Sequence, residues 1–148
     1  MKSLSLPLAL RFSGLLGLVL LLGGCASFDL QAERDFDPTP FKTFFVVTNS
    51  NDNRAMDRHI AAALRARGYQ VEVGPRTMMP DDNEIVVTYQ DQWAWDFADH
   101  LASLRITMRP PEKTAMVATA SLASRLPLRE PPVATVNRLL DSLFAKKK

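Results

Sequence analysis

The pattern of hydrophobic and polar residues predicts a set of strands that begins after residue 40. The run from Phe41 to Thr48 is nearly continuous in aromatic and β-branched residues, which is typical of a strand in the middle of a sheet. Further apolar or alternating runs predict strands over residues 69–73, 84–95, 101–109 and 114–125. In the run 84–95 one face turns polar at Asp91, which indicates that this strand reaches solvent or bends at a bulge.

Two other segments repeat their apolar residues at helical spacing. The first predicts a helix over residues 54–67, with an Asn or Asp at 51–53 capping its start and Gly68 ending it. The second predicts an amphipathic helix near the C-terminus from Val136, Leu139, Leu140, Leu143 and Phe144. The expected order is β-α-β-β-β-β-α. We therefore predict an α+β fold, a two-layer sandwich in which two amphipathic helices cover a mainly antiparallel sheet of about five strands.

Residues 96–104 are open to two interpretations. Asp96, Asp99 and His100 favour a turn, whereas the apolar residues among them are compatible with one or two helical turns. Apolar and polar residues alternate from Leu104 to Arg109. This alternation favours a turn that leads into a strand.

The N-terminal region has the pattern of an export signal. Lys2 and Arg11 are its only charges, and a short apolar core from Phe12 to Leu22 follows them. The sequence Leu22-Gly23-Gly24-Cys25 then resembles a bacterial lipobox. That resemblance implies cleavage between Gly24 and Cys25, a diacylglycerol thioether on Cys25 and an acyl chain on its new amino group. A plain secretory signal followed by a chance cysteine is the alternative.

The lipobox resemblance also implies a location. Ala26 and Ser27 follow the cysteine, without the Asp that retains many lipoproteins in the inner membrane of enteric bacteria. We therefore expect lipid anchoring at the periplasmic face of the outer membrane, or at the cell membrane in a Gram-positive host. Residues 1–24 are the predicted signal peptide, 25–40 a polar tether and 41–148 a single α+β domain.

Composition limits the classes of partner and cofactor. Of 18 basic residues two lie in the signal, so the mature chain has equal numbers of basic and acidic residues, and no nucleic-acid partner is indicated. Cys25 is the only cysteine, which leaves none for a disulfide within the chain. We predict no cofactor beyond the covalent lipid on Cys25.

The mature part also resembles a family of small bacterial lipoproteins of unknown function. The resemblance rests on Asp35-Phe-Asp-Pro38, Phe41-Lys-Thr-Phe44 and Arg67-Gly-Tyr69, and it covers roughly residues 35–125. It implies an α+β fold and an envelope location. It implies no catalytic residue, and the run from Trp93 to Phe97 departs from the family's pattern.

The residues with most chemical potential are Asp91, Asp96, Asp99 and His100. Carboxylates near a histidine are suited to metal binding or to acid–base catalysis. The alternative is a polar turn whose acids face water. The spacing matches no metal-binding motif and no Gly-x-Ser-x-Gly motif is present, so we predict neither a metal site nor catalytic residues.

Two candidate binding surfaces remain. Trp93, Trp95 and Phe97 are two residues apart, so a strand would place them on one side, either as an exposed aromatic row or as sheet packing. On the polar side of the first helix lie Arg54, Arg58 and Arg65, which suit an anionic surface or are simply solvated.

Three functional hypotheses follow from the sequence. The first is a non-enzymatic, lipid-anchored periplasmic binding or accessory module, with an envelope protein or glycan as partner. The second is a subunit of an envelope assembly or transport complex, with strand 84–95 offered for pairing. The third is a lipid-anchored hydrolase that uses the Asp91, Asp96, Asp99 and His100 cluster.

Overall fold

The computed structural model describes residues 28–95, 97–113, 116–124 and 130–145. The predicted signal peptide and Cys25 lie outside these residues, as does Asp96. No helix of the described part is long and apolar enough to cross a membrane.

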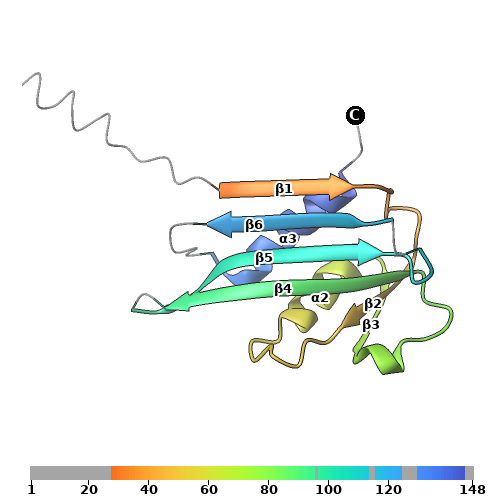
Figure 1. Cartoon of the computed structure of the whole chain (residues 1–148), viewed down its shortest axis with the longest axis horizontal. Helices are drawn as coiled ribbons and strands as arrows, with labels where there is room; N and C mark the ends of the chain where they lie inside the picture. The colour runs from red at the N-terminus through yellow and green to blue at the C-terminus, as the bar shows by residue number, and fades with distance from the viewer. Residues whose placement is uncertain (1–27, 96, 114–115, 125–129, 146–148) are drawn as a thin grey trace, which may run out of the picture.

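Six strands and two α-helices make up the fold (Figure 1). The strands are β1 (Phe28–Arg34), β2 (Thr43–Val47), β3 (Gln70–Gly74), β4 (Ile85–Trp95), β5 (Asp99–Arg109) and β6 (Ala118–Ser124). The helices are α2 (Met56–Arg65) and α3 (Pro132–Phe144), with a short 3₁₀ helix η1 (Arg76–Met78) before β4. Both predicted helices are present, although α2 is shorter than the predicted 54–67. A bend at Phe97 and Ala98 agrees with the expected turn, but β5 begins at Asp99, two residues earlier than the strand predicted over 101–109.

All six strands belong to one sheet in the order β1-β6-β5-β4-β2-β3. β2 runs parallel to β3, because α2 carries the chain back between them, and parallel to β4, because the connection that contains η1 carries the chain from β3 past β2 to β4. The remaining pairs are antiparallel. The α+β class is confirmed, but the sheet is mixed and has one strand more than predicted.

The additional strand is β1, which lies in the segment expected to be a tether. Each of its seven residues pairs with β6, from Phe28 opposite Ser124 to Arg34 opposite Ala118. Charged and polar residues led to the prediction of a tether, but an edge strand with one solvated face tolerates such residues. The folded domain therefore begins only three residues after Cys25.

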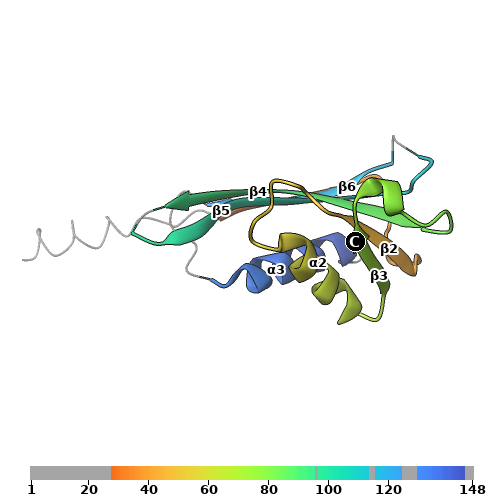
Figure 2. The same cartoon turned by 90° about the horizontal axis from the view of Figure 1, so that it is seen from below.

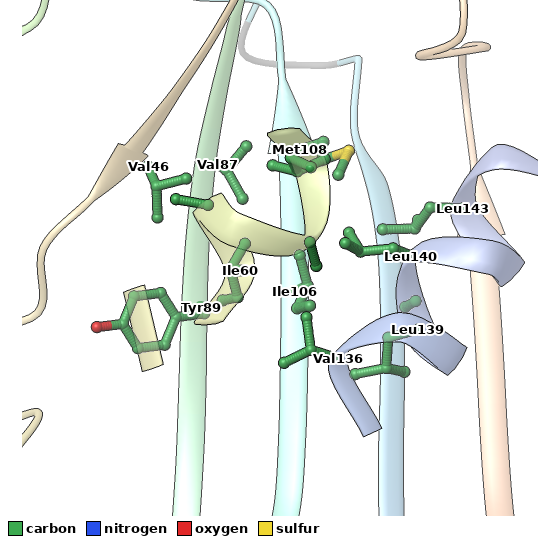
Figure 3. Close-up of a cluster of buried hydrophobic side chains, with 14 of the residues drawn as sticks. Val46, Ile60, Val87, Tyr89, Ile106, Met108, Val136, Leu139, Leu140 and Leu143 are labelled. Carbon is green, nitrogen blue, oxygen red and sulfur yellow. The ribbon is translucent and has the colours of Figure 1, made fainter. Parts of the chain in front are cut away.

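Both helices lie on the same face of the sheet, as Figure 2 shows. The core between them and the sheet includes Ile60 of α2, Val136 and Leu139 of α3, and Val87 and Ile106 of the sheet, all fully buried (Figure 3). At the end of α3, the Arg34 guanidinium donates hydrogen bonds to the carbonyl oxygens of Leu143 and Ala145. These bonds join the end of β1 to the end of α3.

Candidate functional site

On the opposite face of strands β1, β6, β5 and β4 lies no α-helix of the described residues (Figure 2). Its side chains are amides, hydroxyls and a few charges, and they are exposed or half-buried. We call this surface the open face; it comprises Thr88, Gln90, Gln92, Ser103, Arg105, Thr107, Thr119, Ser121, Gln31 and Glu33. This surface was not among the sites predicted from the sequence, although the alternation in residues 101–109 places Arg105 and Thr107 opposite the apolar side chains.

Strand register arranges the open face in rows that cross the sheet. The central row runs from Gln31 through Ser121 and Arg105 to Gln90, and each neighbour in the row is a cross-strand partner. In the adjacent rows, Ser103 Oγ donates to Gln92 Oε1 at 3.2 Å, and the hydroxyl oxygens of Thr107 and Thr119 lie 3.3 Å apart. Cross-strand hydrogen bonds of this kind hold neighbouring side chains in fixed positions.

Arg105 occupies the middle of the open face. It lines three shallow depressions, the first of which has a volume of about 390 Å³ and extends from Gln90 to Gln31. Within the described part of the chain, the exposed guanidinium of Arg105 makes no hydrogen bond or ion pair. Its five N–H donors are thus accessible from solvent.

The open face ends where η1 crosses the sheet. Phe45 and Val86 point to the same side as the open face, but both are buried. A Cβ on Gly74 would lie 3.5 Å from the Phe45 ring and 3.9 Å from the Cβ of Met78 in η1. Phe45 and η1 therefore lie next to one another at Gly74. The candidate site is therefore confined to the four neighbouring strands β1, β6, β5 and β4.

The two tryptophans of β4 lie in different environments. Trp93 is half-buried against the core, and its indole nitrogen donates to Asp91 Oδ2 at 2.6 Å. The Arg54 guanidinium lies 4.5 Å from the centroid of the Trp93 ring and also forms an ion pair with Asp99 at 2.6 Å. Trp93 is therefore engaged within the fold.

Trp95 and Phe97, in contrast, are 73 % and 92 % exposed. Their ring centroids are 6.1 Å apart, and Phe97 has φ of 56°, a left-handed conformation that is uncommon for a bulky residue. We call Trp95 and Phe97 the hairpin tip, because they lie where β4 turns into β5. The predicted aromatic row is thus divided, with one ring engaged and two rings exposed.

The predicted acidic cluster is dispersed over the hairpin. Asp91 accepts the Trp93 indole hydrogen, Asp99 pairs with Arg54, and His100 Nδ1 lies 3.4 Å from the carbonyl oxygen of Ala98. Across residues 28–95, 97–113, 116–124 and 130–145, no three His, Cys, Asp or Glu side chains gather as a metal site. The position of Asp96 lies outside the description.

The three arginines of the first helix do not act as one surface. Arg54 is held by Trp93 and Asp99, and Arg65 donates to the Val71 carbonyl oxygen at 2.6 Å and 3.2 Å. Only Arg58 is exposed without a side-chain hydrogen bond among the described residues. Two of these cations therefore stabilise the fold.

Only part of the hydrogen bonding around the Asp52 carboxylate was predicted from the sequence. Asp52 accepts hydrogen bonds from the Tyr89 hydroxyl at 2.7 Å and from the backbone N–H groups of Arg54 and Met56 at 2.7 and 2.6 Å. Burial alone would raise the pKa of Asp52, but these three donors outweigh it and hold the pKa below its usual value. Burial, followed by the hydrogen bond to Asp52, raises the pKa of Tyr89. Asp52 was one of the residues expected to cap α2. It does so from a position before the helix, and Ala55, which lies between Asp52 and the helix, has a left-handed φ of 55°.

Comparison with known proteins identifies a shared fold. No family model and no curated protein sequence matches this chain. A single-substitution variant of PelC from Paraburkholderia phytofirmans, solved as a dodecamer, aligns with a TM-score of 0.62 and 16 % identity over 79 % of this chain and 99 % of PelC. A second PelC dodecamer from the same organism gives a TM-score of 0.60 at 13 % identity, over 82 % of this chain and 100 % of PelC.

A PDZ domain protein from Parabacteroides distasonis has a more distant likeness. It aligns with a TM-score of 0.52 and 12 % identity over 83 % of this chain, which spans only 36 % of that protein. At these identities the comparisons establish the α+β fold of this chain.

Proposed function

We propose that this protein is a non-enzymatic, lipid-anchored protein of the cell envelope that acts as a binding or accessory module. The observation that carries the proposal is the open face, a polar surface over four strands that neither α-helix of the described chain covers, with Arg105 at its centre. Its expected partner is an envelope protein or a glycan.

The chemistry of the open face suits a ligand that offers many hydrogen-bond acceptors. Gln90 and Ser121 flank Arg105 in the central row, and each can donate and accept hydrogen bonds. Arg105 is held by no carboxylate among the described residues, so it can bind a carbonyl, hydroxyl or acidic group of a partner without first breaking such an ion pair. Both a glycan and a protein segment carry such groups.

The expected lipid on Cys25 would keep this face at the membrane. Two acyl chains give stable anchoring, whereas a single chain binds only marginally. Because β1 begins at Phe28, only a short link would separate the lipid from the sheet. The domain would then remain close to the bilayer surface.

Site-specific photocrosslinking in living cells tests the open face. A photoreactive residue at Gln90 is expected to capture a discrete protein or glycan, and Arg105→Glu is expected to reduce the yield because it reverses the central charge. The matched control is the same photoreactive residue at Ala62, which is exposed on α2 on the helical side of the molecule. Equal labelling at both positions would remove the open face as the binding site.

The anchoring part of the proposal is tested separately. Mass spectrometry of the N-terminal peptide is expected to find a lipid-modified Cys25, and Cys25→Ser is expected to release the protein from the membrane fraction. An unmodified cysteine in membranes of the native host would contradict the proposal.

An assembly subunit is the second candidate function. The observation that favours it is that PelC, which shares the fold, is a dodecamer. The expected donor of a pairing edge was strand 84–95, but β4 pairs with β5 along its length and with β2 at its start. The outer strands of the sheet are β1 and β3, so an assembly through strand pairing would use them. Native mass spectrometry of the detergent-extracted protein distinguishes an oligomer from a monomer.

A further inference from the structure

The hairpin tip lies at the same end of the molecule as the start of β1 (Figure 1). Phe28 pairs with Ser124, and Ala123 pairs with Ser103 of β5, so the start of β1 is level with residue 102. From that level the β4–β5 hairpin continues outward to Phe97. At about 3.3 Å per residue, the three further strand residues up to Asp99, which pairs with Trp95, carry the hairpin about 10 Å beyond the start of β1, and Phe97 lies in the bend at its end.

Cys25 is limited to the same region by the length of the chain. Only Ala26 and Ser27 lie between it and Phe28, so three residue steps join the two Cα atoms. At no more than about 3.6 Å per residue, its Cα lies within about 11 Å of the start of β1. A lipid on Cys25 therefore brings the bilayer surface within reach of Trp95 and Phe97.

The other exposed apolar side chains agree with this orientation. Among the described residues, the exposed large hydrophobic side chains are Met78, Trp95, Phe97 and Val133. Val133 lies in the first turn of α3, which begins at the end of the molecule that carries the tip (Figure 2). Arg34 joins the last residues of β1 and α3, and both elements span about 20 Å, so their first residues are level as well. Of the four side chains, only Met78 lies elsewhere.

We propose that Trp95 and Phe97 insert into the interfacial region of the bilayer that holds the Cys25 lipid, as a second and non-covalent membrane contact. This inference rests on the lipid anchor of the proposed function. Tryptophan is enriched at membrane interfaces because its ring is apolar while its N–H binds water and headgroups. Phe97 adds apolar area next to it.

The lipid and the hairpin tip together define the orientation of the domain on the membrane, which a single flexible lipid anchor does not. β1 and β4 are separated by β6 and β5, so the lipid and the tip are about 14 Å apart along the sheet, at about 4.8 Å per strand. The strands then stand upright on the membrane. The open face points sideways along the membrane surface, accessible to partners beside it.

The test uses the two tryptophans as a matched pair, because they are the only ones in the chain. The full-length lipidated protein is reconstituted in phosphatidylethanolamine–phosphatidylglycerol vesicles whose acyl chains are brominated near the headgroup. In Trp93→Phe the remaining Trp95 is expected to lose at least about half of its emission to bromine quenching, as an interfacial tryptophan should. In Trp95→Phe the remaining Trp93, which is held between Asp91 and Arg54, is expected to lose little.

Equal quenching of the two tryptophans overturns the inference, as does a failure of Phe97→Asp in the Trp93→Phe background to reduce quenching. A tip that binds a protein partner would leave the emission unchanged in these protein-free vesicles and would also overturn it. The mass of the Cys25 peptide is measured on the same samples. A lipidated cysteine with an unquenched Trp95 removes the tip contact alone, whereas an unlipidated cysteine removes the anchoring that both proposals need.

Discussion

The two faces of the sheet are built from the same strands but differ in what their side chains contribute to stability. On β5, Ile106 is fully buried beneath the helices, whereas its neighbour Thr107 faces solvent on the open face. The covered face derives its stability from apolar burial and close packing. The open face contributes little apolar burial, so the stability of the fold places fewer constraints on its residues.

The largest expected difference between the faces is in the free energy of unfolding. Ile106→Ala should cost about 3 kcal/mol, because it removes buried methyl groups and leaves a cavity beneath α2 and α3. Urea denaturation followed by circular dichroism measures this loss. The matched substitution Thr107→Ala, one residue away on the open face, should cost no more than about 1 kcal/mol, because it removes only the hydroxyl contact with Thr119 and the β-propensity of threonine. Similar losses at both positions would show that the open face is not solvated as described.

Asp52→Asn tests a polar contact at the edge of the covered face, where Asp52 accepts the hydroxyl hydrogen of Tyr89. Replacing the carboxylate should cost about 1–2 kcal/mol at pH 7, since hydrogen bonds to charged groups are the stronger ones. Because the pKa of Asp52 is lowered in the folded state, its stabilisation is complete above about pH 4, the usual carboxyl value, and is lost as the pH falls through the folded-state pKa.

The stabilities of the original protein and of Asp52→Asn should therefore converge in acid. Denaturation at a series of pH values from 7 to 3 checks this. Asp81→Asn serves as the control, because Asp81 is exposed in the loop before β4. A difference between the original protein and Asp52→Asn that stays constant with pH would contradict the role of the charge.

Gly68→Ala has a smaller expected effect, at the end of the helix that covers the sheet. Gly68 has φ of 89°, which a residue with a Cβ adopts only with strain, although no atom lies within 4 Å of that position. The substitution should cost about 1 kcal/mol through the backbone conformation alone. Thermal unfolding of Gly68→Ala beside Gly68→Asn, a residue that tolerates this conformation better, separates backbone strain from crowding. An equal loss in both variants would point to another cause.

The smallest effect on stability is expected at the centre of the open face. Arg105→Ala should leave the free energy of unfolding within about 0.5 kcal/mol of its original value, because the side chain is exposed and makes no ion pair with the described residues. The same variant should reduce photocrosslinking from Gln90. A large loss of stability would mean that Arg105 supports the fold, and would remove the reason for placing it in a binding site.

Local pattern was sufficient for some elements. The sequence predicted both helices from the spacing around Ile60 and Leu140, the glycine stop at Gly68 just after α2, and a turn before β5. Each of these depends on residues close in sequence. The partners of β2 were not predicted. The parallel pairing of β2 with β3 follows from the helix between them, which the predicted β-α-β order already contained, whereas the pairing of β2 with β4 depends on the path of residues 75–84, which no local pattern specifies.

The site was harder to predict because it depends on which element covers which side chain. Trp93 and Trp95 lie two residues apart in the same strand and have similar neighbours in the sequence. Only Trp93, however, lies within reach of Arg54. The strand β1 was missed because its polar residues match both a tether and a solvated edge. Without β1 the open face is incomplete, since Gln31 and Glu33 supply its outermost positions.

The pairing of β1 with β6 also has a mechanical consequence. If the protein is pulled through its N-terminus, the force enters at Phe28 and acts along the axis of β1. The hydrogen bonds between β1 and β6 then resist the force together, in shear, instead of opening one after another. At the far end of the strand, Arg34 passes part of the tension to α3. A domain attached in this way can bear tension between a membrane and a bound partner before the sheet separates.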